Sequence, residues 1–382
     1  MKQVYFDNAA TTPMRPEVIS KMTDVMQHTF GNASSTHSIG RSAKALIEKS
    51  RKTIASFLNC SASEIVFTAG GTEADNLVLR SAVRDLGVTE IITSKIEHHA
   101  ILHTVEQLQK EYGISVKYVR LEENGTINPF HLEHLLFNST KKQLVSLMHI
   151  NNEIGNKLDL YGAAHMCKTN NALFHSDTVQ SVGHFPLDLQ AIPVDFIAAS
   201  AHKFHGPKGV GFAFIRKGSG LKASIFGGEQ ERGYRAGTES IHNIVGMEEA
   251  LKYAYTNLTE EHDYILNLKT YFIERLQKAV PKVTFNGNCA DLENSAYTLV
   301  NVCLPISPEK GAMLHFQMDL KGIACSKGSA CQSGSHQNSH VLSEILSSDE
   351  LQKPSVRFSF SRFNTKDEVD YVIDVLKEFV SK

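Results

Sequence analysis

Residues 194–217, VDFIAASAHKFHGPKGVGFAFIRK, decide the fold. The apolar runs 195–202 and 209–217 have the composition of buried strands, and the Gly-Pro pair between them marks a turn. Lys203 stands where the first strand enters this turn. A lysine there is either a solvated turn residue or an amine held at the mouth of a site. These residues taken alone favour the solvated turn residue.

Strand-like and helix-like segments alternate through the first two thirds of the chain. Segments 72–87 and 100–113 carry apolar residues at helical spacing, and each closes on a glycine. Alternation of this kind is typical of βαβ units, so the sequence predicts an α/β fold with seven strands in one sheet. The five other expected strands are 64–70, 90–96, 115–121, 143–150 and 172–177.

The pattern changes after about residue 256. A long amphipathic helix is expected at 260–280 and a final helix at 366–380, with three strands between them, at 283–287, 296–305 and 355–363. A chain of 382 residues is also too long for one ordinary core. We therefore predict a large domain, residues 15–255, and a smaller α+β domain formed by residues 1–14 and 256–382.

Composition argues against nucleic-acid and membrane partners. The formal net charge is -2, with 42% hydrophobic and 21% charged residues, which is typical of an ordinary soluble globular protein. No apolar stretch approaches the ~18 to 20 residues of a bilayer span. The opening MKQVYFDNAATTP lacks the apolar region of a signal peptide. We expect a cytoplasmic protein.

The cysteines show no CxxC pair, so neither a structural metal site nor a disulfide framework is expected. Most of them are interpreted as small buried hydrophobic residues. They are Cys60, Cys167, Cys289, Cys303, Cys325 and Cys331.

Polar residues follow several expected strands at their carboxyl ends, where open α/β sheets bind ligands. In FTAGGTEADN, residues 67–76, two glycines lead into a helix that begins near Thr72. Unpaired N–H groups and the helix dipole make such a start a candidate phosphate cradle. An ordinary helix cap at Thr72 is the alternative.

A carboxylate, an amide and a histidine complete the pattern. Asp177 ends a strand and can keep a ring nitrogen protonated, while Gln180 can donate to a phenolic oxygen. An Asx turn is the alternative for Asp177, and a surface or helix-start position is the alternative for His98. Together with Lys203 and the phosphate cradle, these groups are what pyridoxal phosphate requires: an amine for the Schiff base, a carboxylate for the ring nitrogen and a helix start for the phosphate.

Motifs along nearly the whole chain resemble those of the cysteine desulfurases, in the class V aminotransferase-like branch of the pyridoxal phosphate enzymes, and they occur in the family's order. They are YFDNAATTP, GGTEADN, EHHA, NNEIG, DTVQSVG, SAHKFHGPKGVG, RAGTES, GSAC and VRFSFSRFNT. The resemblance makes Lys203 the Schiff-base lysine. It also implies the fold-type I transferase architecture, in which the large domain holds a mainly parallel seven-stranded sheet between helices.

The resemblance also implies roles for single residues. His98 would stack on the pyridine ring, Asp177 would pair with its nitrogen, and Gln180 would pair with its hydroxyl. Arg357 would clamp the substrate carboxylate, for which a planar guanidinium is well shaped. Asn152 would lie near cofactor and substrate. The other cofactor contacts would come from Gly71, Thr72, Ser200 and His202, and from Thr238 of the neighbouring subunit in a homodimer.

The implied reaction removes sulfur from L-cysteine and gives L-alanine. Lys203 would take the Cα proton, and the thiolate of Cys331 would attack the substrate sulfur, helped by nearby positive charge or by His98 as proton carrier. The persulfide on Cys331 would pass to a sulfur acceptor, such as an iron–sulfur scaffold or a thiolation pathway. Residues 326–339 contain no large apolar side chain, so we expect this segment to be mobile, and we interpret Cys325 as structural.

Two alternatives from other classes stay open. A selenocysteine lyase, or another class V lyase or aminotransferase, would tolerate the loss of the Cys331 thiol or would need an oxoacid partner. A non-catalytic dimer that keeps the fold as a binding partner is the other, and the intact Lys203, Asp177 and His98 argue against it.

Overall fold

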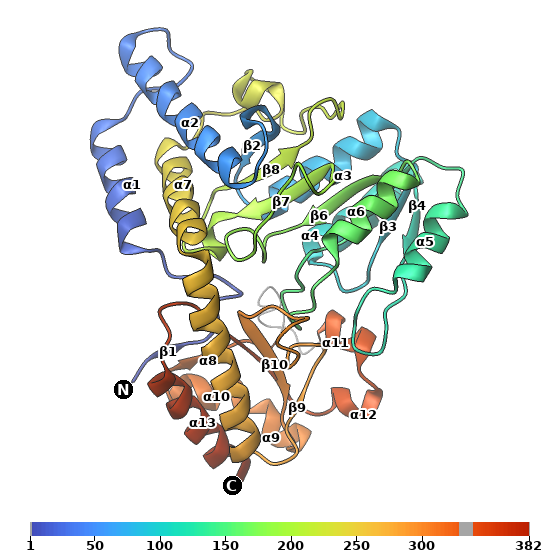
Figure 1. Ribbon diagram of the computed structural model, residues 1–382, viewed down its shortest axis with the longest axis vertical. Helices are drawn as coiled ribbons and strands as arrows, with labels where there is room; N and C mark the ends of the chain where they lie inside the picture. The colour runs from blue at the N-terminus through green and yellow to red at the C-terminus, as the bar shows by residue number, and fades with distance from the viewer. Residues whose placement is uncertain (1, 328–338, 382) are drawn as a thin grey trace.

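The computed structural model describes residues 2–327 and 339–381, so Cys331 lies outside the described residues. A seven-stranded sheet forms the centre of the larger part, in the order β2-β8-β7-β6-β5-β3-β4 (Figure 1). The seven strands expected from the sequence are all present in this sheet. They are β2 (Ile65–Thr68), β3 (Glu90–Thr93), β4 (Ser115–Tyr118), β5 (Gln143–Ser146), β6 (Leu173–Asp177), β7 (Phe196–Ser200) and β8 (Gly211–Ile215).

The sheet is mainly parallel, as predicted. Strands β4, β3, β5, β6 and β7 pair in parallel, whereas β8 is antiparallel to both of its neighbours, β7 and β2. The reason is the short connection 201–210, which contains only the 3₁₀ helix η2 (Ala201–Lys203). A parallel return needs a crossover of a dozen or more residues. The same short connection carries Lys203.

Helices cover both faces of the sheet because its strands are apolar on both sides. Phe196 and Ala198 of β7 contribute to the core under α3 and α4, while Ile197 and Ala199 contribute to the core on the opposite face. The first face is covered by α3 (Gly71–Leu86) and α4 (His99–Tyr112). The second core includes residues of α1 (Pro16–His28), α2 (Ser38–Phe57), α5 (Pro129–Phe137), α6 (Leu160–Thr169) and α7 (Ile241–Thr256).

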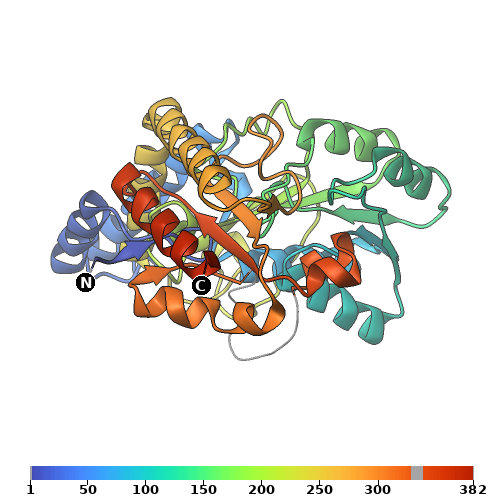
Figure 2. The same cartoon turned by 90° about the horizontal axis from the view of Figure 1, so that it is seen from below.

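The smaller part lies below this sheet in Figure 1 and holds both ends of the chain. Figure 2 shows its two long helices side by side, α8 (Leu258–Ala279) and α13 (Lys366–Ser381). One antiparallel sheet joins β9 (Thr284–Phe285), β10 (Leu299–Cys303) and β12 (Ser355–Ser359), and β1 (Val4–Tyr5) pairs in parallel with β11 (Ile323–Ala324). The short helices of this part are α9 (Pro308–Ala312), α10 (Leu314–Leu320), α11 (His340–Ile345) and α12 (Ser348–Leu351).

Each part has its own apolar core. The core of the smaller part joins Val4 and Phe6 to residues from Ile265 onward, whereas the buried residues of the two sheet cores end at Leu251. We therefore propose to keep the division expected from the sequence, with one domain at 15–255 and the other formed by 1–14 and 256–382.

Candidate active site

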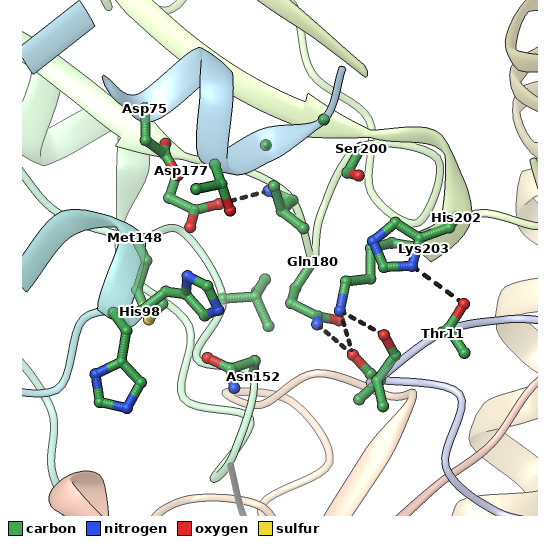
Figure 3. A pocket seen from close by; sticks show the side chains of 18 of the residues that line it. Thr11, Asp75, His98, Met148, Asn152, Asp177, Gln180, Ser200, His202 and Lys203 are labelled. Atoms are coloured by element: carbon green, nitrogen blue, oxygen red, sulfur yellow. Dashed lines mark hydrogen bonds between the residues drawn. The ribbon is translucent and has the colours of Figure 1, made fainter. Parts of the chain in front are cut away.

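A cavity of about 810 Å³ lies at the carboxyl ends of the sheet strands, where the N-terminal segment and β12 also reach it (Figure 3). This volume suits a cofactor with its substrate. The cavity brings together all but one of the residues expected to contact the cofactor, and Arg357 as well. They are Gly71, Thr72, His98, Asn152, Asp177, Gln180, Ser200, His202 and Lys203.

Lys203 lies at the end of η2 and points into this cavity rather than into solvent. Its Nζ donates to two backbone carbonyls of the N-terminal segment, at 2.7 Å to Ala9 and 2.9 Å to Ala10 (Figure 3). The carbonyl of Lys203 is 3.0 Å from Nε2 of His184, which fixes the backbone behind the side chain. The amine is therefore held at the mouth of a site.

Helix α3 provides the anion cradle. Gly70 is its N-cap and Thr72 its second residue, so Thr72 is not the helix cap. The first N–H groups of a helix have no partner within it and lie at its positive end. A Cβ on Gly71 would come within 2.5 Å of Cγ2 of Val179, so a larger residue there would force the side chain of Val179, in the loop after β6, to move. These features fit a phosphate group.

Two side chains from the end of β7 line the same cavity. Ser200 is the last residue of β7, and His202 follows it in η2. Nδ1 of His202 lies 3.1 Å from the hydroxyl of Thr11 (Figure 3). Burial, followed by the charges of Lys203 and Lys208, lowers the pKa of His202 to about 4, so its ring is neutral at pH 7.

Asp177 is the last residue of β6, and the residue is 6% exposed. Its Oδ1 accepts from the backbone N–H of Val179 at 2.9 Å. Asp177 therefore forms the Asx turn given above as the alternative, and it also lines the cavity. Burial raises the pKa of Asp177 to about 6, against the opposite effects of that N–H and of Lys203. A protonated ring nitrogen beside this carboxylate would offset the cost of its buried charge.

His98 and Gln180 line the cavity from the start of α4 and from the loop after β6. Nδ1 of His98 accepts from the N–H of Ala100 at 3.1 Å, so His98 caps α4 while also lining the cavity. Burial and the nearby Lys203 lower the pKa of His98 to about 4. Its neutral ring therefore carries the proton on Nε2. Nε2 of Gln180 donates to the carbonyl of Ala9 at 2.9 Å.

Arg357 reaches the cavity from β12, with its side chain almost fully buried. Its guanidinium donates to the carbonyl of Asn152 and to Oδ1 of Asp7, both at 2.8 Å. Among the described residues, Nε of Arg357 has no hydrogen-bond partner. Asp7 also accepts from the hydroxyl of Ser326 at 2.7 Å. The carboxylate of Asp7 thus orients the guanidinium.

Two expected site residues are not among the described residues that line this cavity. Thr238 is exposed and does not line the cavity of its own chain. Its contact with a neighbouring subunit stays a prediction. The role of Cys331 also stays a prediction, because the residue lies outside the described part of the chain. Cys325 lies just after β11, and burial raises the pKa of its thiol to about 12.

Sequence reasoning assigned no role to three carboxylates at this site, Asp7, Asp75 and Glu153, although Glu153 stands out beside Asn151 and Asn152 after an apolar run. Asp75 has a local signal, because it lies on the apolar face of a helix, four residues before Leu79. Glu153 accepts from the hydroxyl of Ser339, and its side chain is fully buried. Asp7 and Glu153 therefore each hold a serine next to the segment that contains Cys331.

Comparisons with known proteins show the family to which the chain belongs. The model of the class-V aminotransferase family matches residues 4–372. The cysteine desulfurase IscS of Dictyoglomus turgidum is 38% identical, over 100% of this chain and 95% of that protein. A solved NifS-like protein superposes with a TM-score of 0.90 at 34% identity over the whole of both chains. The structure of SspA in complex with cysteine gives 0.79 at 29% identity, over 95% of this chain and all of that one. The chain therefore belongs to the class-V aminotransferase family and, within it, to the cysteine desulfurases.

Proposed function

We propose that the chain is a pyridoxal-phosphate-dependent cysteine desulfurase, which converts L-cysteine to L-alanine and leaves the sulfur as a persulfide on Cys331. The observation that carries the proposal is the single cavity that collects an amine, a buried carboxylate, a helix start and an arginine. Each group matches one part of the cofactor or of an amino-acid substrate.

The residues of the cavity suggest how the cofactor would be held. Lys203 would bind its aldehyde carbon, Asp177 would face the ring nitrogen, and Gln180 its hydroxyl. The neutral ring of His98 would stack on the pyridine. Gly71, Thr72, Ser200 and His202 would surround the phosphate. When bound, the cofactor withdraws electrons from the Cα of the amino acid attached to it.

Lys203 is the proposed proton carrier. Its unprotonated amine takes the Cα proton of cysteine, and the carbonyls of Ala9 and Ala10 then accept hydrogen bonds from the resulting ammonium. The thiolate of Cys331 would bond to the substrate sulfur as the carbon–sulfur bond breaks, and the electron pair of that bond would stay with Cβ. Two protons would then complete alanine: one, equal to that lost by the Cys331 thiol, is added at Cβ, and the one taken by Lys203 is returned to Cα. The sulfur gained by Cys331 balances the sulfur lost by cysteine.

The segment that carries Cys331 begins and ends at the cavity. The backbone of Ser326 exchanges two hydrogen bonds with Arg357, and Ser339 donates to Glu153. Cys331 follows Ser326 by five residues, so chain length alone keeps it within about 17 Å of that anchor. The proposal requires only that the Cys331 thiol can reach the substrate sulfur within this distance.

Mass spectrometry after incubation with cysteine tests the proposed function. We expect one added sulfur on the tryptic peptide that contains Cys331, with alanine formed in equal amount. Cleavage after Lys327 separates this peptide from the one that contains Cys325. Added sulfur on the Cys325 peptide, or alanine without any protein-bound sulfur, would contradict the proposal.

Arg357→Lys tests the substrate clamp. We expect the KM for cysteine to rise by about 10- to 100-fold, because a lysine cannot replace a guanidinium that is oriented by Asp7 and Asn152. The value of kcat should change less. Steady-state kinetics measure both constants, and Arg362→Lys, a change in a partly exposed arginine paired with Glu261, is the matched control. An unchanged KM would show that Arg357 does not bind the carboxylate.

The partner and location assignments are parts of the same proposal. A homodimer would bring Thr238 of one subunit to the phosphate of the other, and a sulfur acceptor such as an iron–sulfur scaffold would discharge Cys331. We also propose a cytoplasmic location. Within residues 2–327 and 339–381, no helix is long and apolar enough to cross a membrane.

A further inference from the structure

Behind Asp177 lies a group of buried ionisable residues that the proposed reaction does not use. Asp75 of α3 is 1% exposed and lines the cavity wall, and its carboxyl group faces that of Asp177 (Figure 3). His175, two residues before Asp177 on β6, is fully buried. Glu97, also buried, is the third acid near Asp75.

These acids cannot all be ionised. Burial, together with the charges of Asp177 and Glu97, raises the pKa of Asp75 well above its ordinary value. Among the described residues, the only ion-pair partner of Asp75 is His175, whose Nε2 is 3.4 Å from Oδ1. Burial lowers the pKa of His175 to about 3, so this ring supplies no positive charge at neutral pH.

Two neighbouring atoms in this group have no hydrogen-bond partner within the described residues. Nδ1 of His175 is 2.9 Å from the hydroxyl of Ser146. Within the described part of the chain, neither Oδ1 of Asp75 nor Nε2 of His175 has a hydrogen-bond partner. Unsatisfied buried polar atoms are rare and need an explanation. Two acids that face each other share a proton more readily than they both ionise.

We propose that Asp75 is a positioning residue for the cofactor: it stays protonated at neutral pH and donates this proton in a hydrogen bond to the carboxylate of Asp177. The inference rests on the proposed function, because its effect is to keep Asp177 ionised opposite a protonated ring nitrogen. His175 lies next to Asp75, with its Nε2 3.4 Å from Oδ1, and stays neutral. The proton remains on Asp75 throughout the reaction, so this residue neither gains nor loses a proton.

The proposal predicts different results for two substitutions of Asp75. Asp75→Asn keeps a neutral side chain of the same shape with an N–H donor, so it should behave like the unaltered enzyme. Asp75→Leu keeps the branching at Cγ, with larger end groups, and removes the donor, which leaves the Asp177 carboxylate without a hydrogen bond from this position. If Asp75 were instead an ionised partner of a protonated His175, the asparagine variant would be as damaged as the leucine variant.

Cofactor binding and its titration are the readouts, measured on apo-protein refilled with pyridoxal phosphate. For Asp75→Leu we expect the Kd for pyridoxal phosphate to rise by about 10- to 100-fold. The pH at which the absorption band of the bound cofactor changes should also rise. A ring that loses its positive charge withdraws fewer electrons from the nitrogen of Lys203, which then keeps its proton to higher pH. Asp75→Asn should stay within about twofold in Kd and show no shift.

Three outcomes are distinguishable. If the unaltered protein binds pyridoxal phosphate but Asp75→Leu matches it, or Asp75→Asn loses tenfold or more in affinity, this inference is wrong while the proposed function stands. If the unaltered protein binds none, the proposed function fails. Asp195→Asn, at a partly buried acid that does not line the cavity, is the control for loss of a carboxylate.

Infrared difference spectroscopy gives a second test that does not depend on the leucine variant folding. At neutral pH the unaltered enzyme should show a carbonyl band of a protonated carboxylic acid that Asp75→Asn lacks. Burial raises the pKa of Glu97 to about 8, so a band from Glu97 should be present in both proteins. Absence of the band that distinguishes the two proteins would overturn the proposal.

Discussion

Cys331→Ser is expected to abolish the formation of alanine and sulfide from cysteine, by about 1,000-fold or more, while the cofactor stays bound. A serine hydroxyl is not ionised at neutral pH and cannot accept the sulfur as a persulfide, whereas a thiolate can. Alanine release, measured with cysteine and a reductant, checks the loss of turnover. The visible absorption of the cofactor checks that binding is intact.

Cys325→Ser is the matched control for this change. Burial raises the pKa of the Cys325 thiol to about 12, so almost none of it is thiolate at neutral pH and it cannot replace Cys331. This variant should therefore keep most of the activity. Steady alanine release by Cys331→Ser would instead favour the alternative of a selenocysteine lyase or another class V lyase.

Lys203→Ala is the second change with a large expected effect. Removal of the amine takes away both the anchor of the cofactor and the group that accepts the Cα proton, so kcat should fall by at least about 1,000-fold. Single-turnover formation of alanine measures the residual rate. Added ethylamine should restore part of that rate, because it replaces the missing base.

Borohydride reduction provides the companion measurement. It should fix one cofactor per chain to the unaltered protein and none to Lys203→Ala, as read from the intact mass. Lys217→Ala, at an exposed lysine just after β8, should behave like the unaltered protein in both assays. Cofactor fixed to a lysine other than 203 would refute the assignment.

The arrangement of strands and helices could be predicted well from local sequence, but the ends of several strands could not. The run 143–150 was expected as one strand, yet β5 ends at Ser146. Leu147, Met148 and Ile150 are buried, but Met148 and Ile150 line the cavity instead of continuing the strand. Apolar composition reports burial, and here burial continues past the last strand pair.

At Asp177 and Lys203 a single strand end left the turn alternatives open, and the site was predicted from the combination of several strand ends and the family motifs. Residues that depend on long-range contacts gave no such signal. Asp7 meets Arg357 from 350 positions away. The partners of the Lys203 amine are backbone carbonyls of two alanines, and a carbonyl is common to every residue. Such contacts follow from tertiary structure alone.

The pairing of β1 with β11 has a consequence for synthesis on the ribosome. Val4 and Phe6 are synthesised well before the segment at Ile323 and Ala324 with which they pair, and that segment emerges only after more than 300 further residues. These apolar side chains therefore stay exposed to solvent during most of translation, while the sheet around Lys203 can already fold. The nascent chain thus contains Lys203 long before Arg357, the residue proposed to bind the substrate carboxylate. Chaperones that hold unfolded chains have their greatest opportunity near Val4 and Phe6.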